Sequence, residues 1–236
     1  MMAALAWAFT AKQSRTMDFR AGTVGMALPM FLVMWVAMMT AMMLPSVAPV
    51  AILWARTISG DRGATASQRG LRMGQFVFGY LAAWTGYGLL AFAMLIGAGA
   101  LVQTLPDGGL WFGSALLGMA GLYQFTPLKD VCLRHCRSPL GQLLQYGAYK
   151  GVARDLRVGL HHGAYCVGCC WGLMVVLIAV GVMNVPAMAA LAAVIFLEKL
   201  WRRGVLLTKA AGAALLLLAA LAPFHPWLVQ GVLLPR

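Results

Sequence analysis

Six long apolar runs divide this sequence, and they constrain its fold more than any other feature. They cover approximately residues 24–46, 74–101, 110–126, 164–183, 186–201 and 205–222. A helix needs about 20 apolar residues to cross a bilayer. The chain is 62% hydrophobic and only 10% charged, whereas a soluble domain carries about 25% charged residues. We therefore predict an all-α fold, a polytopic transmembrane helical bundle of about six spans that forms a single domain over residues 1–236.

The positive charge follows the segments between these runs. With an external N-terminus, 14 of the 18 Lys and Arg residues fall in the inner segments 51–73, 127–163 and 199–209. The positive-inside rule then predicts a multi-pass protein with both termini outside. Because orientation accounts for the net charge of +12, we expect the lipid bilayer as a partner and no nucleic acid.

Local signals predict where some helices begin and end. A proline is a common helix stop, so the first span is expected to end at Pro45. The fourth span is expected to follow a loop containing "HHG" at residues 161–163. Asn184 is suited to cap the turn into the fifth span. Gly-rich stretches such as "FGYLAAWTGYG" predict close contacts between helices, because small residues let spans approach.

The inner loop 127–163 is the one sizeable polar segment. Pro127 suits the first turn of a short helix with Thr126 as its cap. Pro139 is expected to end that helix. A second, basic amphipathic helix from about 141 to 158 is predicted to lie along the inner membrane surface.

All five cysteines and three of the four histidines fall in two short motifs at the ends of this loop. In "CLRHC" the Cys and His residues are spaced i, i+3 and i+4, which places them on one helical face. If "HHGAYCVGCC" is helical, its second His and two of its Cys residues share an arc of about 60°. The candidate metal ligands are Cys132, His135, Cys136, His162, Cys166, Cys169 and Cys170.

Three explanations of the cysteines are open. Thiolate and imidazole are preferred ligands of Zn(II), and thiolate also binds Cu(I). Buried cysteines can instead simply pack as small apolar residues. The spacing of Cys166 and Cys169 in "CVGC" is also that of a redox pair, although no thioredoxin-like βαβ pattern surrounds it. Two clusters that each contain His favour the metal site.

The first apolar run is rich in methionine. Seven of the 16 methionines lie in residues 26–43, and several recur every fourth position on one helical stripe. Thioethers select Cu(I), but methionine is also a flexible gap filler in cores. Met34, Met38 and Met42 are the candidates for a transient thioether path, and packing is the alternative.

Glu198 lies near the inner end of the fifth apolar run, in "IFLEKLWRR". An intramembrane carboxylate is a functional candidate, because charge inside a bilayer is costly. Glu198 could bind metal or relay protons. The alternative is a salt bridge to Lys199, Arg202 or Lys129.

Several of these motifs together resemble a known bacterial family. "MTAMMLPS", "YQFTPLKDVCLRHCRSP", "GAYCVGCCWGLM" followed by "GVMN", and the late "EK" span roughly residues 25–205. They are similar to a family of domains of unknown function catalogued as predicted metal-binding integral membrane proteins. The resemblance implies a protein of the bacterial inner, or cytoplasmic, membrane with a Cys-rich metal site.

We therefore expect a membrane protein that handles or transports a soft metal ion, Cu(I) first and Zn(II) second, at the inner face. A metallochaperone or a partner membrane subunit is a possible partner. No nucleotide-binding motif is present. The alternatives are a membrane thiol or metal redox enzyme that uses Cys166 and Cys169, and a structural or assembly subunit with packing cysteines.

Overall fold

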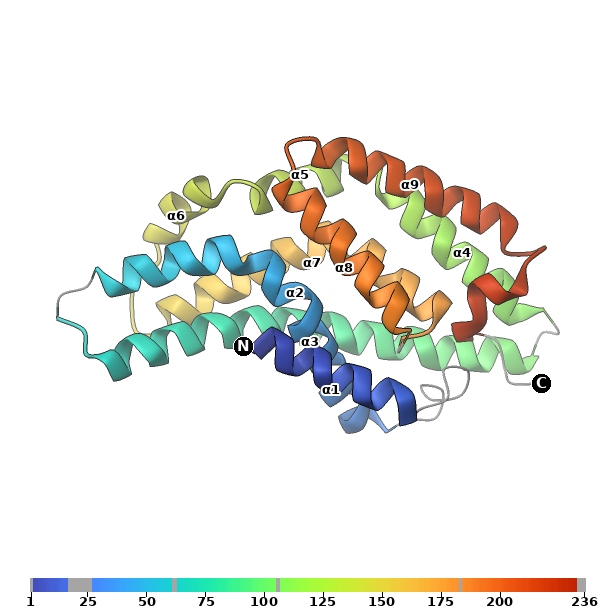
Figure 1. The fold of residues 1–236 in the computed structure, drawn as a ribbon, viewed down its shortest axis with the longest axis horizontal. Coiled ribbons are helices and arrows are strands. Elements are labelled where there is room, and N and C mark those ends of the chain that lie inside the picture. Colours follow the sequence, from blue (N-terminus) through green and yellow to red (C-terminus); the bar gives the residue numbers. More distant parts are fainter. Residues whose placement is uncertain (1, 17–26, 61–62, 105–106, 183, 233–236) are drawn as a thin grey trace.

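The computed structural model describes residues 2–16, 27–60, 63–104, 107–182 and 184–232. These residues form helices joined by short turns, which confirms the all-α prediction (Figure 1). In chain order they are α1 (Met2–Thr16), α2 (Leu28–Ser59), α3 (Ala66–Thr104), α4 (Gly108–Tyr123), α5 (Pro127–Cys136), α6 (Pro139–Gly147), α7 (Arg154–Val180), α8 (Val185–Leu200), α9 (Gly204–Leu221) and the 3₁₀ helix η1 (Pro226–Val232).

Each predicted apolar run lies in a helix of its own, namely α2, α3, α4, α7, α8 or α9. Four of these, α2, α3, α7 and α9, are long and apolar enough to cross a membrane by length and composition. α4 and α8 contain 16 residues each, fewer than the roughly 20 that a full span needs. The number of spans therefore stays approximate. Residues 24–26 and 183, at the ends of two predicted runs, lie outside the described residues.

Helix α7 is the centre of the bundle. It packs against α3, α4, α5, α8 and η1, and Figure 1 shows α3 running alongside it, with the α4–α9 pair at one end. Inside the molecule, 67% of the apolar window of α7 is buried, compared with 22% for α9. Most side chains of α7 are consequently surrounded by protein.

Glycines bring α3 and α7 into close contact. A Cβ atom on Gly159 of α7 would collide with the Phe76 carbonyl of α3, and one on Gly163 would lie 2.9 Å from the Tyr80 carbonyl oxygen. On α3, a Cβ on Gly79 would collide with the Leu156 carbonyl. The predicted close contact through "FGYLAAWTGYG" is confirmed at Gly79, since backbone touches backbone where both helices lack side chains.

The predicted end of the first apolar helix at Pro45 is wrong. α2 continues through Pro45 and Pro49 to Ser59. Proline removes one i→i−4 hydrogen bond and can kink a helix without ending it. The Ser46 hydroxyl donates to the Met43 carbonyl at 2.9 Å, and the following turns pack against α3 and α6, so tertiary contacts hold α2 together past the prolines.

The loop 127–163 is more helical than predicted. α5 begins at Pro127 with Thr126 as its side-chain cap, as expected. The helix predicted over 141–158 is wrong, because α6 ends at Gly147 and α7 begins at Arg154. The "HHG" segment is therefore helical.

Asp155 explains the early start of α7. Its carboxylate is buried and accepts hydrogen bonds from Trp54 Nε1 of α2 and Arg72 Nε of α3, each at 2.9 Å. These bonds fix the first turn of α7 against two other helices, and a carboxylate near a helix N-terminus is also stabilised by the helix dipole. At the other end of α7, Asn184 caps α8 by accepting from the Ala187 N–H at 3.0 Å, as predicted.

Candidate metal centre

Three thiols of α7 form a compact buried group. The Sγ atoms of Cys166, Cys169 and Cys170 all lie within 4.8 Å of one another, and those of Cys169 and Cys170 are 3.1 Å apart. Two thiolates on one ion lie about 4 Å apart, because metal–thiolate bonds are about 2.3 Å long. The Cys166–Cys169–Cys170 triad thus fits a single soft ion. Among the residues that the structure describes, these are the Cys, His, Asp and Glu side chains grouped closely enough to hold one.

The second cysteine motif meets the triad. α5 packs against α7 and places the Cys136 Sγ 3.7 Å from the Cys169 Sγ. Cys132, one turn earlier on α5, lies against Gly168, where an added Cβ atom would be 2.7 Å from the Cys132 Sγ. The two motifs therefore meet: four thiols form one cluster, and Cys132 packs against α7 beside it.

The histidines lie beside this cluster in an aromatic network. The Tyr146 hydroxyl lies 3.2 Å from both the His135 Nε2 and the His162 Nδ1, and the His135 ring stacks on Tyr165 with ring centroids 3.8 Å apart. His161 is hydrogen-bonded to Tyr149 at 2.7 Å. Neither His135 nor His162 belongs to the ion-sized group around Cys169, so their role as ligands stays a prediction.

Protonation on α5 follows from burial. Burial raises the pKa of Cys132, although the charge of Lys129 opposes this, so the metal-free thiol is protonated near neutral pH. Burial, and secondarily the charge of His161, lowers the pKa of His135. Its imidazole is therefore neutral near pH 7.

A buried lysine touches the triad. The Lys199 Nζ donates to the Cys166 Sγ and to the Ser46 Oγ, at 3.1 Å each. An ammonium group beside the thiols would balance negative charge on a metal–thiolate centre, since buried charge requires a partner. The sequence pointed to Lys199 only as a partner of Glu198. Adjacent helical residues point about 100° apart. Glu198 and Lys199 therefore contact different partners, Lys129 and Cys166.

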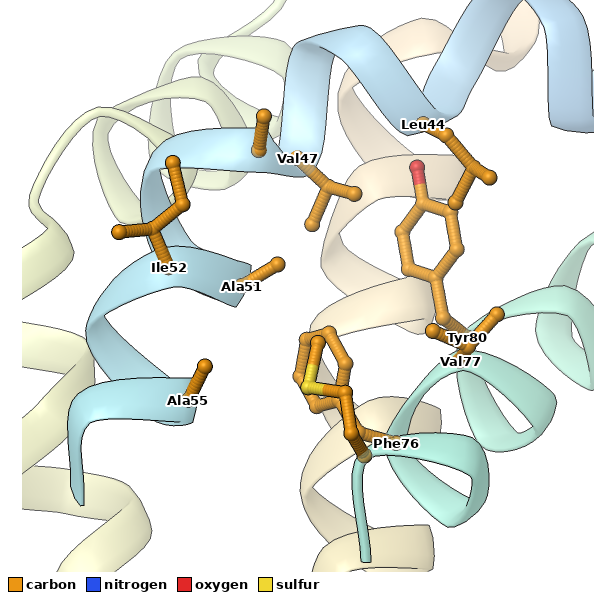
Figure 2. Close-up of a pocket in the computed structure, with 10 residues that line it drawn as sticks. Leu44, Val47, Ala51, Ile52, Ala55, Phe76, Val77 and Tyr80 are labelled. Atoms are coloured by element: carbon orange, nitrogen blue, oxygen red, sulfur yellow. The ribbon is translucent and has the colours of Figure 1, made fainter. Parts of the chain in front are cut away.

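Tyr80 also contacts the triad, and the sequence analysis did not predict this contact. Its hydroxyl lies 3.1 Å from the Cys166 Sγ. Figure 2 shows its ring beside Leu44 and Val47 in an apolar cleft of about 290 Å³ between α2 and α3. Since the cleft is lined almost entirely by hydrocarbon, the Tyr80 hydroxyl forms its hydrogen bond with the Cys166 thiol instead.

Glu198 forms a buried ion pair with Lys129 of α5. The Glu198 Oε2 lies 2.8 Å from the Lys129 Nζ, and both side chains are within 1% of full burial. The same ammonium group donates to the Cys169 carbonyl at 2.6 Å. Burial would lower the pKa of Lys129, but attraction to Glu198 and to the nearby thiols outweighs it and the pKa is raised. Of the three predicted salt-bridge partners, Lys129 is the one that Glu198 meets.

We expect Glu198→Gln to destabilise the protein by about 3 kcal/mol, because it leaves the Lys129 charge buried without a countercharge. The melting temperature, measured by scanning fluorimetry in detergent, should fall by roughly 6–12 °C. The double variant Lys129→Met/Glu198→Leu removes both charges and should melt close to the wild type. Equal melting of Glu198→Gln and the wild type would show that the pair contributes nothing.

The methionine stripe faces the protein interior. Met34, Met38 and Met42 are all buried, together with Met39 and Met43. Ser46, one turn beyond Met42, contacts Lys199, which in turn touches Cys166. The stripe therefore ends close to the triad, while direct binding of metal by these thioethers stays a prediction.

Fold and site together define an all-helical protein with a buried thiol cluster suited to a soft metal ion. A family model described as "PpoB2: Copper chaperone" matches residues 32–222, a stretch that contains every cysteine and every other residue of the site. The chain belongs to this copper chaperone family. No curated protein and no solved structure matched the chain. Membership agrees with the predicted metal-related family and favours copper as the ion.

Proposed function

We propose that this chain is an integral membrane copper chaperone that holds Cu(I) in the Cys166–Cys169–Cys170 triad and passes it to a protein partner. The observation that carries the proposal is the triad itself, three buried thiols within 4.8 Å. Thiolates are soft ligands that favour Cu(I), with Zn(II) as the second choice. Copper here is the cargo of the protein.

The position of the triad supports a site at the inner face of a bacterial cytoplasmic membrane. Lys199, which touches the triad, lies at the end of α8 directly before Trp201, Arg202 and Arg203. Lys and Arg typically mark the cytoplasmic end of a span, and Trp is enriched at both membrane interfaces. The extended ends of α2, α3 and α7, which carry further arginines, lie together in Figure 1. An external location of both termini is part of this proposal.

Metal analysis of the purified full-length protein tests the proposal. After anaerobic loading with Cu(I) and removal of excess metal, wild type should retain about one copper ion per chain, bound by sulfur. The double variant Cys166→Ser/Cys169→Ser should retain almost none. Val131→Ser, on the exposed side of α5, is the control and should load like wild type.

Equal copper content in wild type and the double variant would refute the triad as the copper site. The redox-enzyme alternative makes a different prediction: Cys169→Ala should trap a mixed disulfide between Cys166 and a substrate thiol. Loading with Zn(II) in competition with Cu(I) separates the two metals. Alkaline carbonate extraction of cell membranes should leave the protein in the pellet if it is an integral membrane protein.

A further inference from the structure

The thiols of α5 lie between the triad and the surface of the molecule. Cys132 and Cys136 are each 8% exposed, whereas the three triad residues are 0–1% exposed. They are one helical turn apart, so their Cβ atoms are about 5–6 Å from each other. Leu128 and Val131, on the other side of α5, are more than half exposed. α5 therefore carries two thiols that are slightly more exposed than those of the triad.

Contacts at both ends hold α5 in this position. At its start, the Lys129 Nζ donates to the Cys169 carbonyl at 2.6 Å. Just after its end, the Arg137 guanidinium donates to the carbonyls of Glu198 and Trp201 at 2.7 and 2.8 Å. Because the helix is tied both to α7 and to the end of α8, the spacing of its thiols from the triad is fixed.

Gly168 lets the Cys132 thiol approach α7. An added Cβ atom there would be 2.7 Å from the Cys132 Sγ, which is closer than a nonbonded sulfur allows. The Tyr123 hydroxyl donates to the Gly168 carbonyl and so holds this turn of α7. Gly168 thus leaves room for Cys132, although Cys132 does not belong to the ion-sized group.

We propose that α5 is the transfer element of the protein, in which Cu(I) moves between the triad and the surface through Cys136 and Cys132. This inference rests on the proposed function and adds the route by which the cargo enters and leaves. The first step spans the 3.7 Å between the Cys136 and Cys169 sulfur atoms, a separation that one ion can bridge.

Each step is a ligand exchange without oxidation or reduction. A bond from Cu(I) to the Cys136 sulfur forms, the bond to the Cys169 sulfur breaks, and the proton of the Cys136 thiol passes to the released Cys169 thiolate. Cys132 then replaces Cys166, and a thiol of an external acceptor replaces Cys170, each passing its proton to the thiolate that it releases. Further acceptor thiols replace Cys136 and Cys132 in the same way, and the reverse order loads the triad.

The experiment separates transfer from storage. Full-length protein in detergent is loaded with Cu(I), and transfer to excess bicinchoninate, a chromogenic Cu(I) chelator, is followed by stopped flow. Cys136→Ser should slow transfer at least about tenfold while changing the equilibrium Kd by less than about threefold, because sulfur is replaced on the route and kept in the triad. Cys170→Ser should chiefly raise the Kd. Cys136→Met, which keeps a soft donor, should recover much of the rate, and Val131→Ser is the matched control on α5.

Two results would overturn the transfer route. One is an unchanged rate in Cys136→Ser; the other is a loss of affinity in Cys136→Ser as large as in Cys170→Ser, which would make Cys136 a storage ligand. An unchanged Kd in Cys170→Ser contradicts the triad and thus the proposed function instead. A measurement without metal is independent of both proposals: brief treatment with iodoacetamide should alkylate Cys132 and Cys136 before any triad residue. Equal labelling of all five thiols would contradict this order of exposure.

Discussion

Replacing Cys169 with Ser is expected to raise the Kd for Cu(I) by at least about a hundredfold, which corresponds to about 2.7 kcal/mol. The Cys169 sulfur contacts thiols on both helices, since it lies 3.1 Å from that of Cys170 and 3.7 Å from that of Cys136. Serine is nearly isosteric but offers a hard oxygen, which is a poor ligand for Cu(I). Competition of the purified protein against a Cu(I) chelator measures the change.

Cys132→Ser is the matched control for this prediction. It makes the same sulfur-to-oxygen exchange in the same cluster, but at a position against Gly168 and outside the ion-sized group. Its Kd should stay within about threefold of the wild type, because the three triad sulfurs remain. If Cys132→Ser weakened binding as much as Cys169→Ser, the copper site would have to be centred on α5.

Gly159→Val should prevent stable folding, with an expected loss of more than about 3 kcal/mol. Any side chain at this position collides with the Phe76 carbonyl of α3, which is backbone and cannot rotate away. α3 and α7 would have to separate, and theirs is the most extensive helix contact in the described structure. Yield of monodisperse protein and the melting temperature in detergent provide the measurement.

Gly74→Ala, also on α3, is the control for Gly159→Val. Nothing lies within 4 Å of a Cβ atom at that position, so alanine adds helix propensity of about 0.5–1 kcal/mol without a clash. This variant should melt at or slightly above the wild-type temperature. A normally folded Gly159→Val would contradict the close contact between α3 and α7.

Apolar patterning predicted which parts of the chain form helices. All six apolar runs lie in separate helices, because they are rich in Ala, Leu and Met, which favour a helix. The caps at Thr126 and Asn184 were also predictable, since a cap depends on residues three positions apart. Helix ends that depend on distant partners were not: α2 passes its prolines, and Asp155 starts α7 early through contacts with α2 and α3.

The candidate site divides in the same way. Local spacing identified all five cysteines, of which four lie in one cluster and Cys132 lies against Gly168. It did not identify Tyr80 and Ser46, or the contact of Lys199 with Cys166, because those residues come from three other helices and no local motif marks them. Glu198 was recognised as a residue that needs a partner, and the fold selected Lys129.

By itself the sequence determined the helical fold class, the soft chemistry of the cysteines and the pairing of each Cys motif with a histidine. These follow from composition and from spacings within one or two helical turns. Such local properties do not depend on how the helices pack against one another. Only the tertiary structure decided that the two motifs meet and that three thiols form the ion-sized group, with the histidines in an aromatic network beside it. Those outcomes depend on how closely α5 and α7 approach. Gly168 of α7 permits that approach, and Lys129 of α5 stabilises it through its contacts with Cys169 of α7 and Glu198 of α8.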